Sequence, residues 1–278
     1  IMWGWVLAVI LLGTGLLYSL TMGFPQVRCF GHIIRSLKST LKSDGDAVSG
    51  FAALCAAVGG QVGTGSLVGV ASALAAGGPG ALFWMWITAV FGMVLSFGEA
   101  TLGQAFHEKD KDGNYYGGAP YYMTNGLGNR GLAIAYALTS VFAVGICIAM
   151  LQNNSIASAV TGVMDISPWI HGFLDTILTA VIVLGGVKRI TDAASLIVPF
   201  MAVGYILITI IIIITHLSEV PAMFATIFKS AFTLEAAAGG AIGYTIKEAV
   251  RNGVARGLFS NDAGNGGTAA MHAAAKVK

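Results

Sequence analysis

Six long apolar stretches follow one another along this chain of 278 residues, and they constrain its fold more than any other feature. About 20 residues of α-helix cross the roughly 30 Å hydrocarbon core of a bilayer. In lipid every backbone polar group must be satisfied inside the protein, so we expect these stretches to span as helices. They cover residues 2–22, 49–76, 80–106, 132–151, 169–186 and 190–215. The sequence therefore predicts an all-α polytopic membrane protein.

The amino-acid composition agrees with a membrane protein and argues against a soluble domain, a nucleic-acid-binding protein and a cysteine-based metal or disulfide framework. Hydrophobic side chains make up 56% of the residues and charged ones 10%, whereas soluble domains are roughly one quarter charged. The net charge of +2 is too small to indicate a nucleic-acid partner. The cysteines Cys29, Cys55 and Cys147 are odd in number and widely spaced, which fits neither a disulfide framework nor a metal cluster.

The N-terminal region divides into a spanning helix and a surface helix. Residues 1–22 read as a transmembrane helix rather than a signal peptide, because the run is long and lacks a basic start. In residues 27–42, apolar side chains recur at helical spacing with basic residues between them. This pattern is typical of a cytoplasmic amphipathic helix lying on an anionic membrane surface, so the lipid bilayer is an expected partner.

The distribution of Lys and Arg indicates the orientation of the spans. If the N-terminus lies outside, the cytoplasmic loops at residues 23–48, 107–131 and 187–189 carry nine basic residues. The opposite loops, at residues 77–79, 152–168 and 216–235, then carry only Lys229. The positive-inside rule favours this outside-first topology. We expect a multi-pass protein of the cytoplasmic (inner) membrane with its N-terminus outside.

The second apolar stretch contains a predicted break. Glycines and polar residues alternate in its middle, where the sequence of residues 59–66 reads GGQVGTGS. Glycine in a helix interior costs up to about 1 kcal/mol relative to alanine, so we expect residues 59–65 to unwind. Unwound backbone at membrane depth can coordinate a cation through its carbonyls and hold a carboxylate through its amides. Close helix packing through Gly65 and Gly69 is the alternative.

A second segment of the same kind lies far downstream. Residues 257–270 read GLFSNDAGNGGTAA, with a second Gly-x-Gly at Gly264–Gly266. Paired interrupted helices in corresponding halves are a sequence indication of a transporter binding site. If the breaks at Gly63 and Gly264 are equivalent, one repeat is about 200 residues long.

Residues 77–92, GGPGALFWMWITAVFG, match a signature of the sodium:alanine symporter (alanine or glycine:cation symporter) family. VGTGSLVGVASALAAGG, which starts at Val62, and ARGLFSNDAGNGG, which starts at Ala255, also resemble the family's pattern. The resemblance covers essentially the whole chain. Ser66 stands where the family usually has Asn, and Asp262 where it usually has Glu. Both replacements keep an oxygen ligand on a smaller or shorter side chain.

The resemblance implies a leucine-transporter-type (LeuT-type) inverted-repeat fold with an extra N-terminal helix. Residues 49–215 would then form core helices 1–5, residues 216–254 an external or interfacial segment, and residues 255–278 the broken sixth helix that starts repeat two. On this basis the chain looks truncated after the start of repeat two.

The resemblance also implies secondary active symport, in which a small neutral amino acid, alanine or glycine, enters with sodium by alternating access. The implied sodium ligands are Gly59, Gln61, Val62 and Ser66. The implied substrate-binding residues are Gly63, Thr64, Gly65, Ser66, Gln152, Phe259, Ser260 and Asn261.

Several of these residues also fit simpler roles. Gln152 reads equally well as a loop amide, because turn formers follow it. Ser260 and Asn261 are also common helix caps. Glu99 lies inside an expected span, where it is either a proton-coupling acid or, as we favour, a hydrogen-bond partner of unwound backbone.

Other functions remain as alternatives. Proton-coupled amino-acid transport and an ion or solute channel are open, since broken helices also build filters. An enzyme is not expected, because the histidines are scattered and the chain has neither a phosphate loop nor a nucleophile elbow. The sequence shows no sign of an obligate protein partner.

Overall fold

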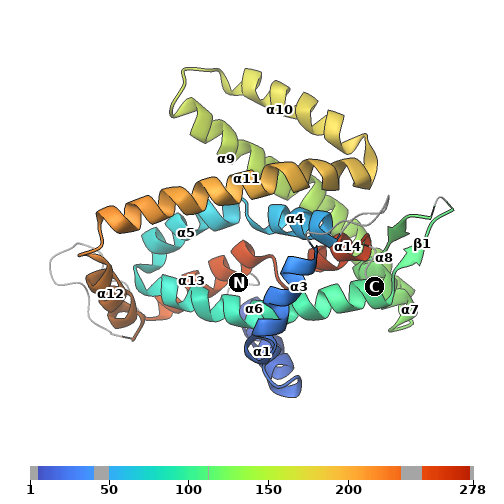
Figure 1. Ribbon diagram of the computed structural model, residues 1–278, viewed down its shortest axis with the longest axis horizontal. Coiled ribbons are helices and arrows are strands. Elements are labelled where there is room, and N and C mark those ends of the chain that lie inside the picture. Colours follow the sequence, from blue (N-terminus) through green and yellow to red (C-terminus); the bar gives the residue numbers. More distant parts are fainter. Residues whose placement is uncertain (1–5, 41–49, 112, 233–245, 276–278) are drawn as a thin grey trace. The chain divides into compact units, whose positions relative to one another are not determined.

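The computed structural model describes residues 6–40, 50–111, 113–232 and 246–275, and nearly all of them are helical (Figure 1). Those parts of the expected segments that fall on residues 1–5, 41–49, 233–245 and 276–278 lie outside the described residues. Within the described part, four helical stretches are long and apolar enough to cross a membrane: Gly50–Gly77, Gly80–Ala105, Arg130–Thr161 and Gly186–Thr215. Three shorter helices are also apolar. The expectation of a helical, multi-pass membrane protein is confirmed.

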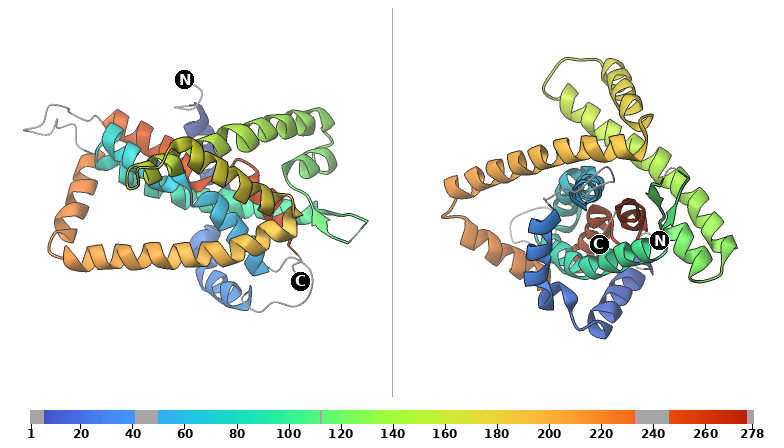
Figure 2. Two further views of the ribbon diagram at one scale, coloured as in Figure 1. Left: turned by 90° about the horizontal axis from the view of Figure 1, so that it is seen from above. Right: turned by 45° about the vertical axis from the view of Figure 1, so that its right-hand side comes forward.

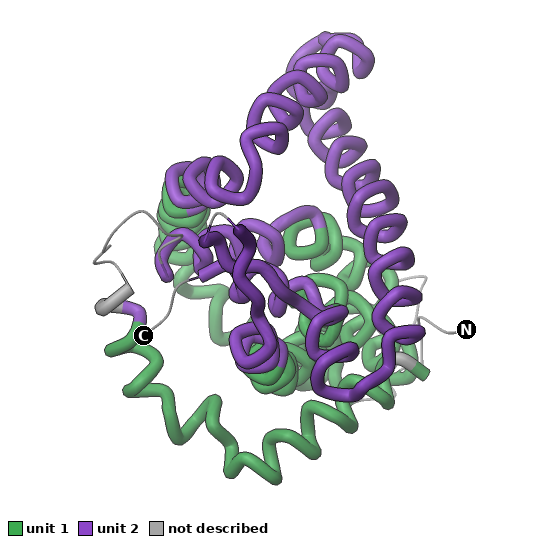
Figure 3. Tube along the Cα trace, turned by 90° about the vertical axis from the view of Figure 1, so that its right-hand side faces the viewer, with its two compact units in different colours: residues 1–36, 65–98, 199–265 green, residues 37–64, 99–198, 266–278 purple. Residues whose placement is uncertain are grey.

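The helices group into two compact units, coloured separately in Figure 3. The first unit contains residues 1–36, 65–98 and 199–265. Its helices are α1 (Leu7–Thr21), α2 (Pro25–Arg28), the start of α3 (Phe30–Thr40), most of α5 (Thr64–Gly77), the first part of α6 (Gly80–Ala105), the second part of α11 (Gly186–Thr215), α12 (Val220–Phe232) and α13 (Ile246–Asn261).

Small residues let α13 lie directly against α6 in the first unit. A Cβ atom at Gly253 would collide with the carbonyl oxygen of Ala81, and one at Gly257 would lie 3.0 Å from Thr88 Cβ. Glycines four residues apart lie on one helix face, so they form a groove into which the neighbouring backbone fits. Val254 and Leu258, next to this groove, are buried in a core cluster.

Aromatic rings fix α12 to the start of α6 in the same unit. The ring of Phe83 lies 4.9 Å from that of Phe232 and 5.6 Å from that of Phe228. Trp86 lies 6.0 Å from Phe224. Such edge-on and tilted pairs contribute about 0.5–1.5 kcal/mol each beyond area burial. The aromatic residues of this region therefore serve packing.

The second unit contains residues 37–64, 99–198 and 266–278. Its elements are the end of α3, α4 (Gly50–Gln61), the first residue of α5, the end of α6, strands β1 (Glu108–Lys109) and β2 (Tyr115–Tyr116), α7 (Ala119–Asn125), α8 (Arg130–Phe142), the π-helix η2 (Ala143–Ile148), α9 (Ala149–Thr161), α10 (Pro168–Val183), the start of α11 and α14 (Gly267–Ala273). α8, η2 and α9 run end to end as one rod, from which α10 folds back (Figure 2).

The structure differs from the expected segments in four places. Residues 187–189, expected as a loop, lie in the first turn of α11. The antiparallel hairpin of β1 and β2, with Glu108 opposite Tyr116, adds a small strand pair to a helical chain. The span expected to end at residue 151 continues to Thr161. α13 begins at Ile246, before the expected boundary at residue 255, because the charged residues in its first turns do not interrupt the helix.

Gly103 tests the packing of α14 against α6. A Cβ atom there would collide with the carbonyl oxygen of Ala269 and lie 3.0 Å from Ala269 Cα. Overpacking of this kind costs about 1–3 kcal/mol, so Gly103→Ala should lower the thermal unfolding midpoint in detergent. Gly204→Ala on α11 is the control, because nothing lies within 4 Å of its Cβ position. An equal or higher midpoint for Gly103→Ala would contradict this packing.

Candidate functional site

The first helix break is shorter than the sequence predicts. α4 ends at Gln61 and α5 begins at Thr64, so only Val62 and Gly63 are not helical. Gly59 and Gly60 stay in the helix because they serve packing: Cβ atoms there would lie 2.9 Å from Val198 Cγ2 and 2.7 Å from Met271 Cε. The expected unwinding of residues 59–65 is therefore wrong in extent, although the break lies within that range.

Gln152 occupies the gap that this break leaves. The backbone N–H of Thr64, the first of α5, donates a hydrogen bond of 3.1 Å to Gln152 Oε1. The first N–H groups of a helix have no partner within it, so this side chain replaces the missing carbonyl. Gly63 makes room, since a Cβ atom there would lie 2.5 Å from Gln152 Nε2. Gln152 lies within α9, so its interpretation as a loop amide is wrong.

Two threonines complete what we call the Gln152 cluster. Its members, all in the second unit, are Gln61, Gly63, Thr64, Gln152 and Thr268. Gln61 Nε2 donates to Thr268 Oγ1 over 3.2 Å, and Thr268 is buried. Thr64 Oγ1 is also buried, but it has no hydrogen-bond partner. A buried hydroxyl without a partner is uncommon.

The second break runs from Asp262 to Gly266, between α13 and α14. Three of its residues have positive φ: Asp262 at 48°, Gly264 at 89° and Gly266 at 82°. Asn265 Nδ2 donates to Asp262 Oδ1 over 2.5 Å, which stabilises the turn. Glycine adopts positive φ without strain, which explains the Gly-x-Gly pattern at this position.

Two side chains of α6 hold the ends of α14. Glu99 is buried, and its Oε1 accepts a hydrogen bond of 2.9 Å from the N–H of Gly266. Gln104 Nε2 donates to the carbonyl of His272 and, over 3.2 Å, to that of Ala275. The interpretation of Glu99 as a partner of unwound backbone is confirmed. Sequence reasoning missed Gln104 and Thr268, because a lone polar side chain in an apolar helix does not reveal its partner.

The first unit holds a second group of predicted residues, which we call the Ser260 cluster: Gly65, Ser66, Phe259, Ser260 and Asn261. The hydroxyl oxygens of Ser66 and Ser260 lie 3.0 Å apart. A Cβ atom at Gly65 would lie 3.0 Å from the ring of Phe259, so glycine is needed for this contact. Asn261 Nδ2 is buried and has no hydrogen-bond partner.

The structure thus gathers the predicted residues into two clusters, each within one unit. Two expected sodium ligands lie in neither: Gly59 packs against Val198, and Val62 is 44% exposed while its N–H donates to the carbonyl of Val58. Among the described residues, no group of three or more His, Cys, Asp or Glu side chains is placed to hold a metal ion. The clusters instead offer hydroxyl, amide and backbone groups, which suit a hard monovalent cation or a zwitterion.

Comparison of the sequence with known proteins places the chain in one family. The profile of the sodium:alanine symporter family matches residues 1–278. The chain is 44% identical over 277 residues to a proposed sodium/proton-dependent alanine carrier, YrbD of Bacillus subtilis, covering 100% of this chain and 56% of that protein. It is 41% identical over 282 residues to the sodium/alanine symporter AgcS of Methanococcus maripaludis, covering 99% of this chain and 61% of that protein.

A further relative is the amino-acid carrier protein AlsT of Bacillus subtilis, which is 40% identical over 269 residues. This alignment covers 96% of the chain and 56% of that protein. The chain therefore spans little more than half the length of these relatives. The family and the names of these relatives are those of transporters rather than enzymes, in agreement with the sequence analysis.

Glu99 offers a test of how the second break is held. Glu99→Leu leaves the N–H of Gly266 without its acceptor, whereas Glu99→Gln keeps an oxygen at the same place. A buried donor without a partner costs about 1–3 kcal/mol, so Leu should lower the thermal unfolding midpoint in detergent more than Gln does. Equal midpoints for the two variants would show that this hydrogen bond does not stabilise the break.

Proposed function

Because this chain belongs to the sodium:alanine symporter family, we propose that it takes up a small neutral amino acid, alanine or glycine, together with sodium by alternating access. The observation that carries the proposal is the pair of helix breaks, one at residues 62–63 inside the apolar stretch Gly50–Gly77 and one at residues 262–266 between α13 and α14. Broken helices in transporters supply backbone dipoles for ions and substrate at mid-membrane.

The proposed architecture is of the leucine-transporter type. In it, α1 is the extra N-terminal helix, the broken helix of α4 and α5 starts the first repeat, and the broken helix of α13 and α14 starts the second. Two inverted repeats, each beginning with a broken helix, account for the spacing of about 200 residues between the breaks. The membrane is the cytoplasmic one, with the N-terminus outside, as the distribution of basic residues indicates.

The Gln152 cluster supplies the first set of proposed roles. The amides at Gly63, Thr64 and Gly65 bind the substrate carboxylate at the N-terminus of α5, where the helix dipole favours negative charge. Gln152 holds this turn in place and contacts the substrate. The partnerless Thr64 Oγ1 supports the assignment, because it can bind the carboxylate or a cation directly.

The Ser260 cluster supplies the second set. Phe259 packs on Gly65 and limits the size of the substrate side chain, which favours alanine or glycine. Ser260 and Asn261 provide polar groups for the substrate, and Asn261 Nδ2 still lacks a partner. One sodium ion is assigned to the carbonyls of Gly59 and Val62, and the side chains of Gln61 and Ser66 are assigned to a second ion. All of these groups can offer an oxygen ligand, as a hard cation requires.

Proton coupling is the second candidate for the driving ion. The relative YrbD is named for both sodium and protons. Glu99, the candidate acid for this role, accepts a hydrogen bond from the backbone of the second break. We therefore assign coupling to sodium and give Glu99 a structural role.

Uptake into proteoliposomes tests the proposal. The intact transporter should accumulate labelled alanine with saturable kinetics when sodium is outside, and replacing sodium with choline should reduce the initial rate by about tenfold or more, because ion and substrate stabilise the same states. Uptake driven by a proton gradient without sodium would favour the second candidate. A rate that rises linearly with alanine concentration would indicate a channel.

Thr64 tests the assignment of the first break. Thr64→Val removes Oγ1 with little change of shape and should weaken sodium-dependent alanine binding about tenfold, as expected for one lost hydrogen bond or ligand. Thr64→Ser should retain most of the affinity. The control is Thr139→Val, whose exposed hydroxyl donates to the Ala135 carbonyl of its own helix. Unchanged binding in Thr64→Val would remove this hydroxyl from the site.

A further inference from the structure

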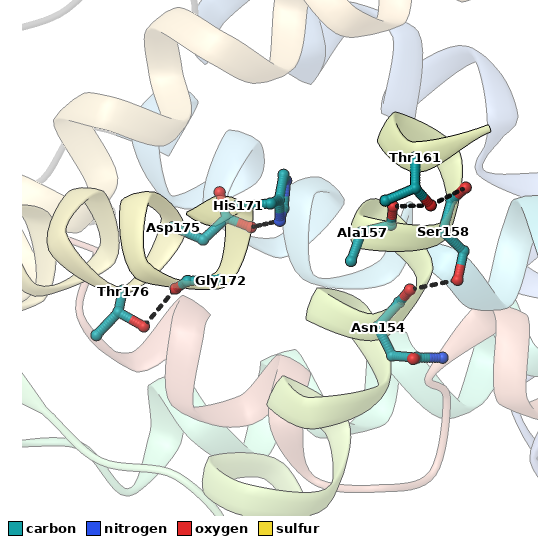
Figure 4. A network of polar contacts seen from close by, with 8 residues as sticks. All are labelled: Asn154, Ala157, Ser158, Thr161, His171, Gly172, Asp175 and Thr176. Atoms are coloured by element: carbon teal, nitrogen blue, oxygen red, sulfur yellow. Dashed lines mark hydrogen bonds and ion pairs between the residues drawn. The ribbon is translucent and has the colours of Figure 1, made fainter. Parts of the chain in front are cut away.

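α10 carries a histidine and a carboxylate one helical turn apart in an otherwise apolar helix. Its sequence is PWIHGFLDTILTAVIV, and His171 Nδ1 lies 3.4 Å from Asp175 Oδ2 (Figure 4). The two atoms are within the range of an ion pair, but His171 Nδ1 is buried and makes no hydrogen bond of good geometry. Ionisable residues in apolar helices of membrane proteins are rare, and they usually mark a functional site.

The pair lies on the shielded face of α10. The side chains of His171 and Asp175 are 12% and 29% exposed. Apolar neighbours on the same helix are much more exposed: Trp169, 87%; Phe173, 67%; Leu178, 61%. In a bilayer these apolar side chains meet lipid, whereas the histidine and the carboxylate are turned away from it.

The neighbouring helix contributes polar groups but no charge. α9 packs against α10 and contains no Asp, Glu, Lys, Arg or His between Ala149 and Thr161. Its hydroxyls bond to their own helix: Ser158 Oγ donates to the Asn154 carbonyl over 2.8 Å, and Thr161 Oγ1 to the Ala157 carbonyl over 2.9 Å (Figure 4). The hydroxyl protons of Ser158 and Thr161 are therefore already used and cannot be donated to the Asp175 carboxylate.

Other charged residues near α10 in the sequence lie beyond its two ends. Asp165 precedes the helix, and Lys188, Arg189 and Asp192 follow it in the first turns of α11. His171 is in the first turn of α10, at the opposite end from α11. On the shielded face itself, Asp175 is therefore the charge that balances a protonated His171.

We propose that His171 and Asp175 form a proton-binding site, separate from the two helix breaks, through which transport responds to pH. With one proton the pair is neutral overall, whether the proton lies on the imidazole or on the carboxylate. Loss of that proton leaves the Asp175 carboxylate with no compensating charge on α9 or α10, which is costly at membrane depth. Histidine is suited to such a site because its charge changes between about pH 5 and 8.

α9 links this site to the Gln152 cluster. The same helix carries Gln152, which holds the N–H of Thr64, and packs against the helix that carries the pair. A change of net charge at His171 and Asp175 therefore acts on the helix that positions the first break. This inference rests on the proposed function, because the response to pH is measured as a change in the rate of amino-acid uptake.

The experiment measures sodium-driven alanine uptake by the intact transporter between about pH 5.5 and 8.5, a range that brackets histidine titration. The rate of wild-type uptake should change severalfold with pH, and the curve should follow the titration of a single proton. His171→Gln and Asp175→Asn should remove this dependence while uptake persists at a constant level. The control is His216→Gln, since His216 is exposed at the end of α11 and should leave the profile unchanged. Wild-type profiles in both variants, or a flat wild-type profile, would overturn the proposal.

Thermal unfolding in detergent gives a readout that does not depend on transport. A proton site that exists only in the native state makes stability depend on pH. The difference in unfolding midpoint between the wild type and His171→Gln should therefore change with pH. If uptake is absent at every pH but this difference is present, the proposed function fails and the proton site stands. If the difference is absent, the proton site fails.

Discussion

A helix that stops inside a membrane leaves N–H groups that lipid cannot satisfy, and the arrangement of this protein depends on how those groups are met. At the first break the N–H of Thr64 donates to Gln152, and at the second the N–H of Gly266 donates to Glu99. Both acceptors are side chains of other helices, although the second break is also held within itself by the hydrogen bond from Asn265 to Asp262. The polar residues of α6 and α9 thus have a structural reason to lie in apolar helices.

Satisfying the backbone in this way leaves particular side-chain groups without partners. Thr64 Oγ1 and Asn261 Nδ2 are buried and make no hydrogen bond. Leaving a buried polar atom in this state costs about 1–3 kcal/mol. These two groups are therefore the ones on which the proposed site draws.

The sequence predicts the existence of the breaks better than their extent. Glycines that alternate with polar residues are unusual in an apolar spanning helix, so the breaks near Gly63 and Gly264 can be predicted from the sequence alone. Gly59 and Gly60 look the same in the sequence, yet they remain helical because Val198 and Met271 pack against them. Propensity is a property of the residue, whereas packing depends on partners more than a hundred positions away.

The same limit applies to side-chain partners. Gln152 could be named as a site residue from the family resemblance, but its place inside a helix and its bond to Thr64 depend on the tertiary structure. Thr268 and Gln104 gave no signal at all, because each is a single polar residue whose role is set by its neighbour. His171 and Asp175 are four residues apart, a spacing too common to indicate a site until the shielding of both side chains is known.

Hydrogen–deuterium exchange of the backbone amides at residues 62–66 and 262–267 tests the central claim most directly. If the two breaks bind the ion and the substrate, sodium and alanine together should slow exchange in both segments, and neither alone should do so fully. Exchange that stays the same in both segments under conditions where the protein transports alanine would show that ion and substrate bind elsewhere.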